Sequence, residues 1–211
     1  MNKKPVESNY EITKKRVQKK FVEYDQENMI RKFDLEYDDD YLYIFFIKRK
    51  YRVDRKNGKV EWSEDGFVYR TEAGYDEAMS IYDVLCCSKE NCCLSGEFAP
   101  IDSVKRTFVS ADSGGGFFGK SARMFDQKKE KFEKACEHLG GIREGIGDLS
   151  FRLDTFEFLP VIVEFWESDE EFEAKLQILW DKNTMDYIDY ETSFFVASHL
   201  LRRISELMEE M

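Results

Sequence analysis

The stretch Leu159-Pro160-Val161-Ile162-Val163-Glu164-Phe165-Trp166 decides the fold, because its apolar residues recur at the two-residue period of a β-strand. A second alternating stretch follows at residues 172–180, with Phe172, Ala174, Leu176, Ile178 and Trp180 on one face. The five residues between the two stretches are Glu-Ser-Asp-Glu-Glu, and charge at a turn protects a sheet from pairing with other chains. We therefore expect residues 161–165 to pair with residues 172–180 as an antiparallel hairpin that has one buried face.

A helix follows the hairpin at the end of the chain. Val196, Leu200, Ile204 and Leu207 recur at the spacing of one helical face. This pattern predicts an amphipathic terminal helix that packs on the hairpin.

Further strands are expected near the middle of the chain. Residues 41–47 form an apolar run that is too short for a helix, which favours a central strand covered on both faces. Residues 51–54 and 59–62 flank Asn57-Gly58, a pair typical of a two-residue hairpin turn. We expect this register to place Val53 opposite Trp62.

Several helices accompany these strands. Val17, Phe21 and Tyr24 indicate a first helix, and Asp25 is placed to cap a second helix that ends at residue 33. Further helical patterns cover residues 75–87 and residues 123–138, and Gly140-Gly141 ends the latter. The sequence predicts a single α+β domain over residues 1–211, with a helical N-terminal arm (1–33) and a core (34–211) in which a mixed or antiparallel sheet of hairpins packs against several helices.

The composition of the 211-residue chain limits the possible function classes. Hydrophobic residues make up 42% and aromatic residues 15%, which is enough to fold, whereas the longest apolar run falls far short of the ~20 residues of a membrane span. The first residues lack an apolar signal core, so we expect a cytoplasmic protein with five reduced cysteines. A net charge of -11 opposes binding to nucleic acid.

Gly114-Gly115-Gly116-Phe117-Phe118-Gly119-Lys120-Ser121 matches the phosphate-loop pattern G-x-x-x-x-G-K-[ST]. In that chemistry Gly114 and Gly119 let backbone N–H groups cradle phosphates, Lys120 reaches the outer phosphates and Ser121 holds Mg²⁺. A working phosphate loop sits in a parallel sheet, however, and this chain's strands look like hairpins. The two phenylalanines also suit a glycine-rich surface loop that is anchored to the core, so both interpretations stay open.

Four cysteines lie within eight residues, at Cys86, Cys87, Cys92 and Cys93. Four thiolates could bind zinc or an iron–sulfur cluster. Adjacent cysteines on a helix point about 100° apart, and metal motifs usually separate their ligands by two or more residues. A buried Cys86 and an incidental pair in a loop is the alternative interpretation.

The order of motifs resembles an uncharacterised domain family from anaerobic bacteria and archaea, over residues 33–207. The motifs that carry the resemblance are Tyr51-Arg52-Val53 with Asn57-Gly58, Leu94-Ser95-Gly96-Glu97-Phe98, Leu139-Gly140-Gly141, Gly147-Asp148, the strand 159–166 with Asp169-Glu170-Glu171-Phe172, and Leu179-Trp180-Asp181. The resemblance implies a role in anaerobic cofactor metabolism, since some relatives carry an added iron–sulfur segment. That segment is absent here, and the family has no established catalytic residues to transfer.

The leading hypothesis is an accessory protein, rather than an enzyme, that binds a small ligand, a cofactor or a protein partner in anaerobic metabolism. The alternatives are a nucleotide-binding protein that uses Gly114, Gly119, Lys120 and Ser121, and a thiolate metal protein that uses Cys86, Cys87, Cys92 and Cys93. Neither nucleic acid nor a membrane is an expected partner. The sequence leaves the cofactor and the ligand unidentified.

Overall fold

Seven α-helices accompany a nine-stranded antiparallel sheet in the computed structural model, which describes residues 8–105, 118–145 and 147–211. The expected α+β class, with a sheet packed against helices, is therefore confirmed. The strands are β1 (Tyr41–Phe46), β2 (Arg49–Asp54), β3 (Val60–Ser63), β4 (Thr71–Glu72), β5 (Phe98–Pro100), β6 (Ile142–Arg143), β7 (Leu149–Phe156), β8 (Leu159–Trp166) and β9 (Lys175–Asp181). The helices are α1 (Asn9–Phe21), α2 (Gln26–Phe33), α3 (Tyr75–Cys87), α4 (Ile101–Lys105), α5 (Gly119–Phe125), α6 (Lys129–His138), the 3-10 helix η1 (Thr184–Asp186) and α7 (Tyr190–Glu210).

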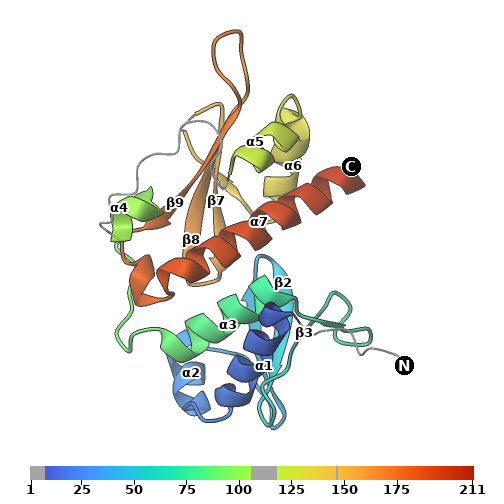
Figure 1. Ribbon diagram of the computed structural model, residues 1–211, viewed down its shortest axis with the longest axis vertical. Helices are drawn as coiled ribbons and strands as arrows, with labels where there is room; N and C mark the ends of the chain where they lie inside the picture. Colours follow the sequence, from blue (N-terminus) through green and yellow to red (C-terminus); the bar gives the residue numbers. More distant parts are fainter. Residues whose placement is uncertain (1–7, 106–117, 146) are drawn as a thin grey trace.

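The sheet has the order β4-β3-β2-β1-β7-β8-β9-β5, and β6 pairs with β7. Its two parts meet at a narrow seam, where Phe46 of β1 pairs with Phe156 of β7 and the Ile47 N–H donates to the Thr155 carbonyl at 2.7 Å. Figure 1 shows β2 and β3 with α1, α2 and α3 in the lower half, and β7, β8 and β9 with α4, α5 and α6 in the upper half. Helix α7 runs diagonally between the halves and packs against α3 and α6.

The hairpin expected from residues 161–165 and 172–180 is formed by β8 and β9, with Val161 opposite Trp180 and Phe165 opposite Leu176. Strand β9 begins at Lys175 rather than at residue 172, and Phe172 is 69% exposed in the turn. The expectation of one buried face is wrong, because Ile162 and Glu164 on the other face are also buried. Strand β8 lies between β7 and β9, so cross-strand neighbours on both sides cover these outward residues.

Strand β1 is less buried than the sequence predicted. It is central, between β2 and β7, but only Leu42, Ile44 and Phe46 are buried, whereas Phe45 on the other face is 38% exposed. The prediction of a strand covered on both faces is therefore wrong.

The hairpin of β2 and β3 forms with a different register from the one expected. Val53 lies opposite Val60, and Trp62 lies opposite Tyr51. The Asp54 carboxylate accepts hydrogen bonds from the backbone N–H groups of Lys56 and Asn57 at 2.8 and 3.0 Å, which closes a four-residue loop instead of a two-residue turn. Only Gly58 in this loop has a positive φ, of 75°.

The helical predictions hold at α1, α2, α3 and α7. Asp25 caps α2 by accepting a hydrogen bond from the Asn28 N–H at 2.9 Å, and α3 has the expected bounds. The single helix expected over residues 123–138 is instead two helices, α5 and α6. The chain turns between them because Asp126 accepts hydrogen bonds from the backbone N–H and the hydroxyl of Ser168, and Gln127 adopts a φ of 59°.

The motifs that carry the family resemblance meet in pairs in the fold. The buried Asp181 carboxylate accepts hydrogen bonds from the Ser95 N–H at 2.9 Å and from the Gly96 N–H at 2.8 Å, which joins the Leu179-Trp180-Asp181 motif to Leu94–Phe98. The Asp148 carboxylate accepts from the Glu167 N–H at 3.0 Å. A Cβ on Gly147 would lie 3.0 Å from the Trp166 ring. These motifs therefore fix the architecture of the upper half.

Candidate functional site

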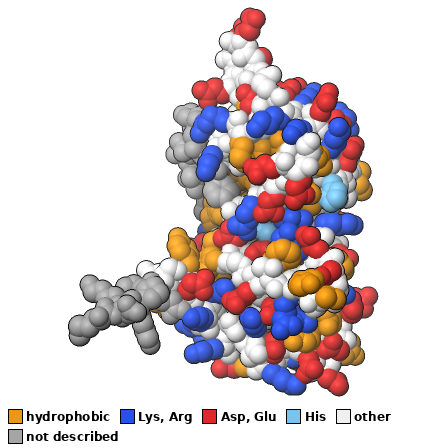
Figure 2. Space-filling view, turned by 90° about the vertical axis from the view of Figure 1, so that its right-hand side faces the viewer, with side chains coloured by type: hydrophobic (Ala, Val, Ile, Leu, Met, Phe, Trp, Pro, Cys, Tyr) orange, Lys and Arg blue, Asp and Glu red, His pale blue; other side chains and the backbone are white. Residues whose placement is uncertain are grey.

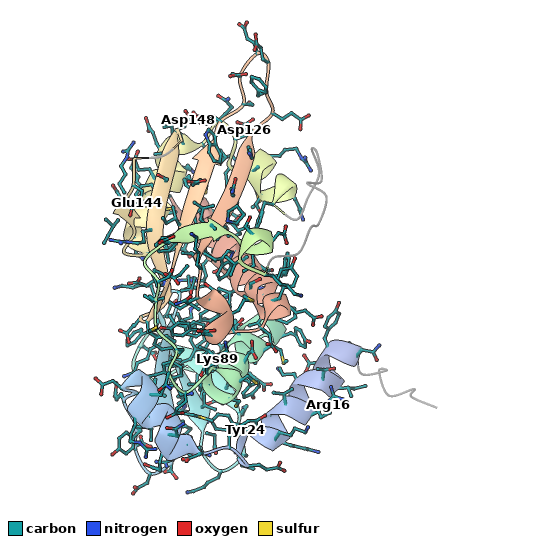
Figure 3. The ribbon with its side chains drawn as sticks, turned by 90° about the vertical axis from the view of Figure 1, so that its left-hand side faces the viewer. Arg16, Tyr24, Lys89, Asp126, Glu144 and Asp148 are labelled. Carbon is teal, nitrogen blue, oxygen red and sulfur yellow. The ribbon has the colours of Figure 1, made fainter. Side chains whose placement is uncertain are left out.

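A cleft of about 970 Å³ lies between α1, α3 and the beginning of α7. Figure 3 labels Arg16 on α1 and Tyr24 in the turn that follows, and it shows α1 lying beside α3. One wall comes from α1, the floor from α3, and the opposite wall from α4, η1 and α7. The lining residues are Thr13, Arg16, Val17, Lys20, Tyr24, Tyr75, Met79, Tyr82, Asp83, Cys86, Cys87, Lys105, Met185, Asp189, Tyr190, Glu191, Thr192 and Phe195.

Helix α1 presents one face to the cleft because of its spacing. Thr13, Arg16, Val17 and Lys20 recur at intervals of three and four residues, so their side chains share a helical face. Lys14, which is buried, holds the helix in place: its ammonium lies 3.0 Å from the Glu72 carboxylate and donates to the Ala73 carbonyl at 3.1 Å. The wall is therefore anchored to the segment that leads into α3.

Aromatic rings make the floor and the far wall of the cleft. Tyr75 packs edge-to-face against Phe195 of α7, with ring centroids 5.4 Å apart. The Tyr82 hydroxyl donates to the Gly58 carbonyl at 2.7 Å, and the Tyr190 hydroxyl donates to Asp102 at 2.5 Å. These contacts fix the rings, so the apolar surface is preformed.

The carboxylates of the cleft all lie away from α1, whereas its cations lie on both walls. Arg16 and Lys20 lie on α1, and neither forms an ion pair within 4.0 Å with any residue that the structure describes. Asp83, Asp189 and Glu191 lie on the α3 and α7 side. The Lys105 ammonium lies 3.8 Å above the Tyr190 ring.

The carboxylates of Asp83 and Asp189 lie close together at the start of α7. The Asp189 N–H donates to the Asp83 carboxylate at 2.7 Å, which ties α7 to α3. The negative charge of Asp83, followed by burial, raises the pKa of Asp189. Asp83 thus positions an element of the cleft.

The structure places the four predicted cysteine ligands in two different surroundings. Cys86 and Cys87 line the cleft at the end of α3. Cys92 and Cys93 do not line the cleft, and the Asn183 amide donates to the Cys93 carbonyl at 3.0 Å. Among the described residues, no three His, Cys, Asp or Glu side chains are arranged to hold a metal ion. The thiolate metal site stays a prediction.

The two cleft thiols are protonated at neutral pH. Burial raises the pKa of Cys86 to about 12, and the charge of Cys87 adds to the effect. Cys87 is exposed at its surface, but partial desolvation of its thiol raises its pKa to about 11, together with the charge of Asp83 and a hydrogen bond to it. Since the thiolate is the nucleophilic form, neither group is activated for attack.

The phosphate-loop-like segment is only partly described. Gly119, Lys120 and Ser121 form the first turn of α5, and Lys120 is exposed. Gly114 lies outside the described residues. Nucleotide binding at this segment stays a prediction.

Sequence reasoning missed a buried polar cluster of Tyr51, Glu77 and His199. The Tyr51 hydroxyl donates to Glu77 at 2.6 Å, and Nε2 of His199 lies 3.1 Å from that hydroxyl. Arg202 lies 2.7 Å from Nδ1 of His199, so Nδ1 accepts and Nε2–H donates to Tyr51. Burial, followed by the charges of Arg202, Arg49 and Arg203, lowers the pKa of His199 to about 2. The signal in the sequence was that Tyr51, Glu77 and His199 are polar residues at positions where their strand or helix faces the core.

None of the described helices is long and apolar enough to span a membrane. No curated protein and no solved structure matches the chain. A family model described as a domain of unknown function, DUF3786, matches residues 25–203. The chain therefore belongs to the DUF3786 family.

Proposed function

We propose that this protein binds a small molecule in the cleft between α1, α3 and α7, and that this molecule has a planar apolar body and an anionic group. The observation that carries the proposal is a preformed aromatic cleft of about 970 Å³ beside two cations, Arg16 and Lys20, that pair with no described residue. Ligand sites are typically concave, largely apolar and equipped with a few polar groups that orient the ligand.

The position of each group supports this ligand chemistry. Tyr75 and Phe195 offer ring surfaces for a flat ligand, and their mutual contact limits the entropy lost on binding. Arg16 and Lys20 on the opposite wall suit a carboxylate, sulfonate or phosphate, because two neighbouring cations attract an oxyanion. A neutral apolar compound would leave these two cations unused.

The chemistry of the cleft favours binding over catalysis. Its thiols are protonated, and the Asp83 carboxylate is engaged by the Asp189 N–H and by Cys87. A catalytic nucleophile needs an adjacent base or a lowered pKa, and these thiols show the opposite shift. An accessory or carrier role fits these properties. The anaerobic setting of that role is supported by the family resemblance alone.

The proposal is tested with anilinonaphthalene sulfonate (ANS), a fluorescent probe that has a flat apolar body and one anionic group. We expect saturable binding to the folded protein. Because two cations are lost, the double substitution Arg16→Gln/Lys20→Gln should weaken this binding by roughly three- to tenfold.

The matched control is Lys19→Gln/Lys134→Gln, which removes two exposed cations that do not line the cleft. It should leave the ANS affinity unchanged. Equal affinities for the wild type and Arg16→Gln/Lys20→Gln, with thermal unfolding showing both folded, would contradict the proposal.

Mass spectrometry of the protein purified without oxygen tests the anaerobic setting. The folded protein should release a flat, anionic compound on denaturation. If protein purified from cells grown without oxygen releases no such compound, this result counts against a ligand from anaerobic metabolism.

A further inference from the structure

A second cavity of about 580 Å³ lies on a different face of the molecule from the α1/α3/α7 cleft. It is enclosed by the β1–β2 turn, β3, the end of α6 and the last turns of α7. Figure 2 shows Lys and Arg side chains gathered across the middle of this face, at the level between the two halves of the molecule.

Two arginines are built into the walls of this cavity. Arg49 and Arg203 are each only 9% exposed. The Arg49 guanidinium stacks on the Trp62 ring, 3.6 Å from its centroid, and donates to Glu64 at 3.0 Å. Arg203 donates to Glu206 at 2.9 Å, while its buried Nε–H has no acceptor among the described residues. The guanidinium of Arg203 therefore retains capacity to donate hydrogen bonds.

The cavity is lined by both cations and carboxylates, and its two arginines are more buried than their carboxylate partners. Lys48, Arg49, Lys50 and Arg203 line it, together with Glu64, Glu206 and Glu210. The Glu64 and Glu206 side chains are 65% and 43% exposed, so water screens their charges more than those of the two buried arginines. Lys50 pairs with Glu36, 2.6 Å away, whereas the exposed Lys48 has no carboxylate within 4.0 Å among the described residues.

Each arginine is paired with a carboxylate, Arg203 with Glu206 and Arg49 with Glu64 and, at a longer distance, Glu77. His199 is uncharged, because Arg202 donates to its Nδ1 and burial disfavours the imidazolium. The nearest buried carboxylate, Glu77, lies 4.0 Å from Arg49 and already accepts hydrogen bonds from Tyr51 and from the Gly74 N–H. An anion in the cavity would therefore compete with Glu64 and Glu206, which are partly exposed, for the two guanidinium groups.

The backbone at the edge of the cavity adopts an unusual conformation. Ile47 and Lys48 form the β1–β2 turn with φ angles of 48° and 60°. A β-branched residue is rare in this region, and such strain persists where the surrounding structure holds it. Ile47 is buried and hydrogen-bonded to Thr155, so the turn is held in place with Lys48 and Arg49 at the cavity.

We propose that this cavity binds the phosphate group of a small phosphorylated molecule. The planar guanidinium groups of Arg49 and Arg203 can each donate two hydrogen bonds to the oxygens of a phosphate group, and Lys48 adds a cation at the edge of the cavity. Trp62 and Phe45 provide an apolar surface for the rest of the ligand, and the cavity is larger than a phosphate group requires. The site is separate from the α1/α3/α7 cleft and does not depend on the function proposed for it.

Inorganic phosphate and pyrophosphate are the probes for the test, with the full-length protein and sodium chloride of matched ionic strength as the blank. We expect saturable binding by calorimetry and a change in tryptophan fluorescence that Trp62→Phe removes. Arg203→Gln should weaken binding at least fivefold, and Lys48→Gln, at an exposed position, should weaken it less. Lys134→Gln on α6, outside the cavity, should bind like the wild type.

Circular dichroism establishes that each variant is folded, and if Arg203→Gln fails to fold, Lys48→Gln and Arg203→Lys carry the test. No saturable binding at millimolar phosphate would overturn the proposal. Binding that Lys120→Ala abolishes while the cavity variants keep it would also overturn it, and would place the anion at the Gly114–Ser121 segment instead.

Discussion

At the scale of single residues, Asp181 shows how a buried charge holds two distant segments together. Its carboxylate accepts hydrogen bonds from the N–H groups of Ser95, Gly96 and Asn183 and from the Ser95 hydroxyl. Burial alone would raise the pKa of Asp181, but these hydrogen bonds outweigh it and lower the pKa below its ordinary value. The negative charge is therefore part of the fold rather than of a reactive site.

Asp181→Asn should lower the free energy of unfolding by about 2–3 kcal/mol at neutral pH, since hydrogen bonds to a charged acceptor are lost. The folded-state pKa is depressed, so the contribution of the carboxylate is present above its unfolded pKa of about 4 and disappears as the pH falls through the folded pKa. Urea unfolding at neutral and acid pH measures this. The control Asp39→Asn, at an exposed position, should have little effect. A difference between wild type and Asp181→Asn that stays constant down to strongly acid pH would contradict the account.

At the scale of elements, α1 depends on one side chain for its position as a wall of the cleft. Lys14 is 6% exposed and bonds to Glu72 and to the Ala73 carbonyl, whereas Lys19 on the same helix is exposed. The attachment of α1 is therefore localised, and it should fail locally.

Glutamine is shorter than lysine and uncharged, so Lys14→Gln should lose the bonds to Glu72 and to the Ala73 carbonyl. The free energy of unfolding should fall by about 1–2 kcal/mol. Tryptic cleavage within α1 should become faster, because local opening exposes the helix. Limited proteolysis measures the cleavage rate, and ANS titration should show weaker binding in the same variant. Lys19→Gln is the control. Unchanged proteolysis and ANS affinity in Lys14→Gln would show that α1 is held by other contacts.

The sequence predicted elements best where the pattern was local. The apolar spacing of α3 marked both of its ends, and the hairpin of β8 and β9 followed from alternation. Strand β7, however, was not recognised, although Leu149, Phe151 and Leu153 alternate and are buried. The break between α5 and α6 was also missed, because it depends on Asp126 meeting Ser168, which is 42 residues away.

At the scale of the whole molecule, the candidate sites depend on contacts that no local pattern records. The α1/α3/α7 cleft is built from residues 13 to 195, and the arginine cavity joins the β1–β2 turn to the end of α7. The sequence singled out Cys86 and Cys87 because of the spacing of the four cysteines. Both do line the cleft, but that spacing gives no information about the residues around them. The aromatic floor and the cationic wall became visible only once α1, α3 and α7 were placed together.

The central claim is tested most directly by measuring whether bound ANS protects Cys87 from a thiol-alkylating reagent. The alkylation is carried out at mildly alkaline pH, and its extent is measured by mass spectrometry of tryptic peptides. Cys87 and Cys93 are both exposed, but only Cys87 lines the cleft, and cleavage after Lys89 separates them into different peptides. Because the pKa of Cys87 is about 11, its alkylation is slow enough to follow and should rise about tenfold per pH unit. If the cleft is the ligand site, saturating ANS slows alkylation of Cys87 severalfold and leaves the rate at Cys93 unchanged. Equal rates at Cys87 with and without bound ANS would contradict a ligand site in this cleft.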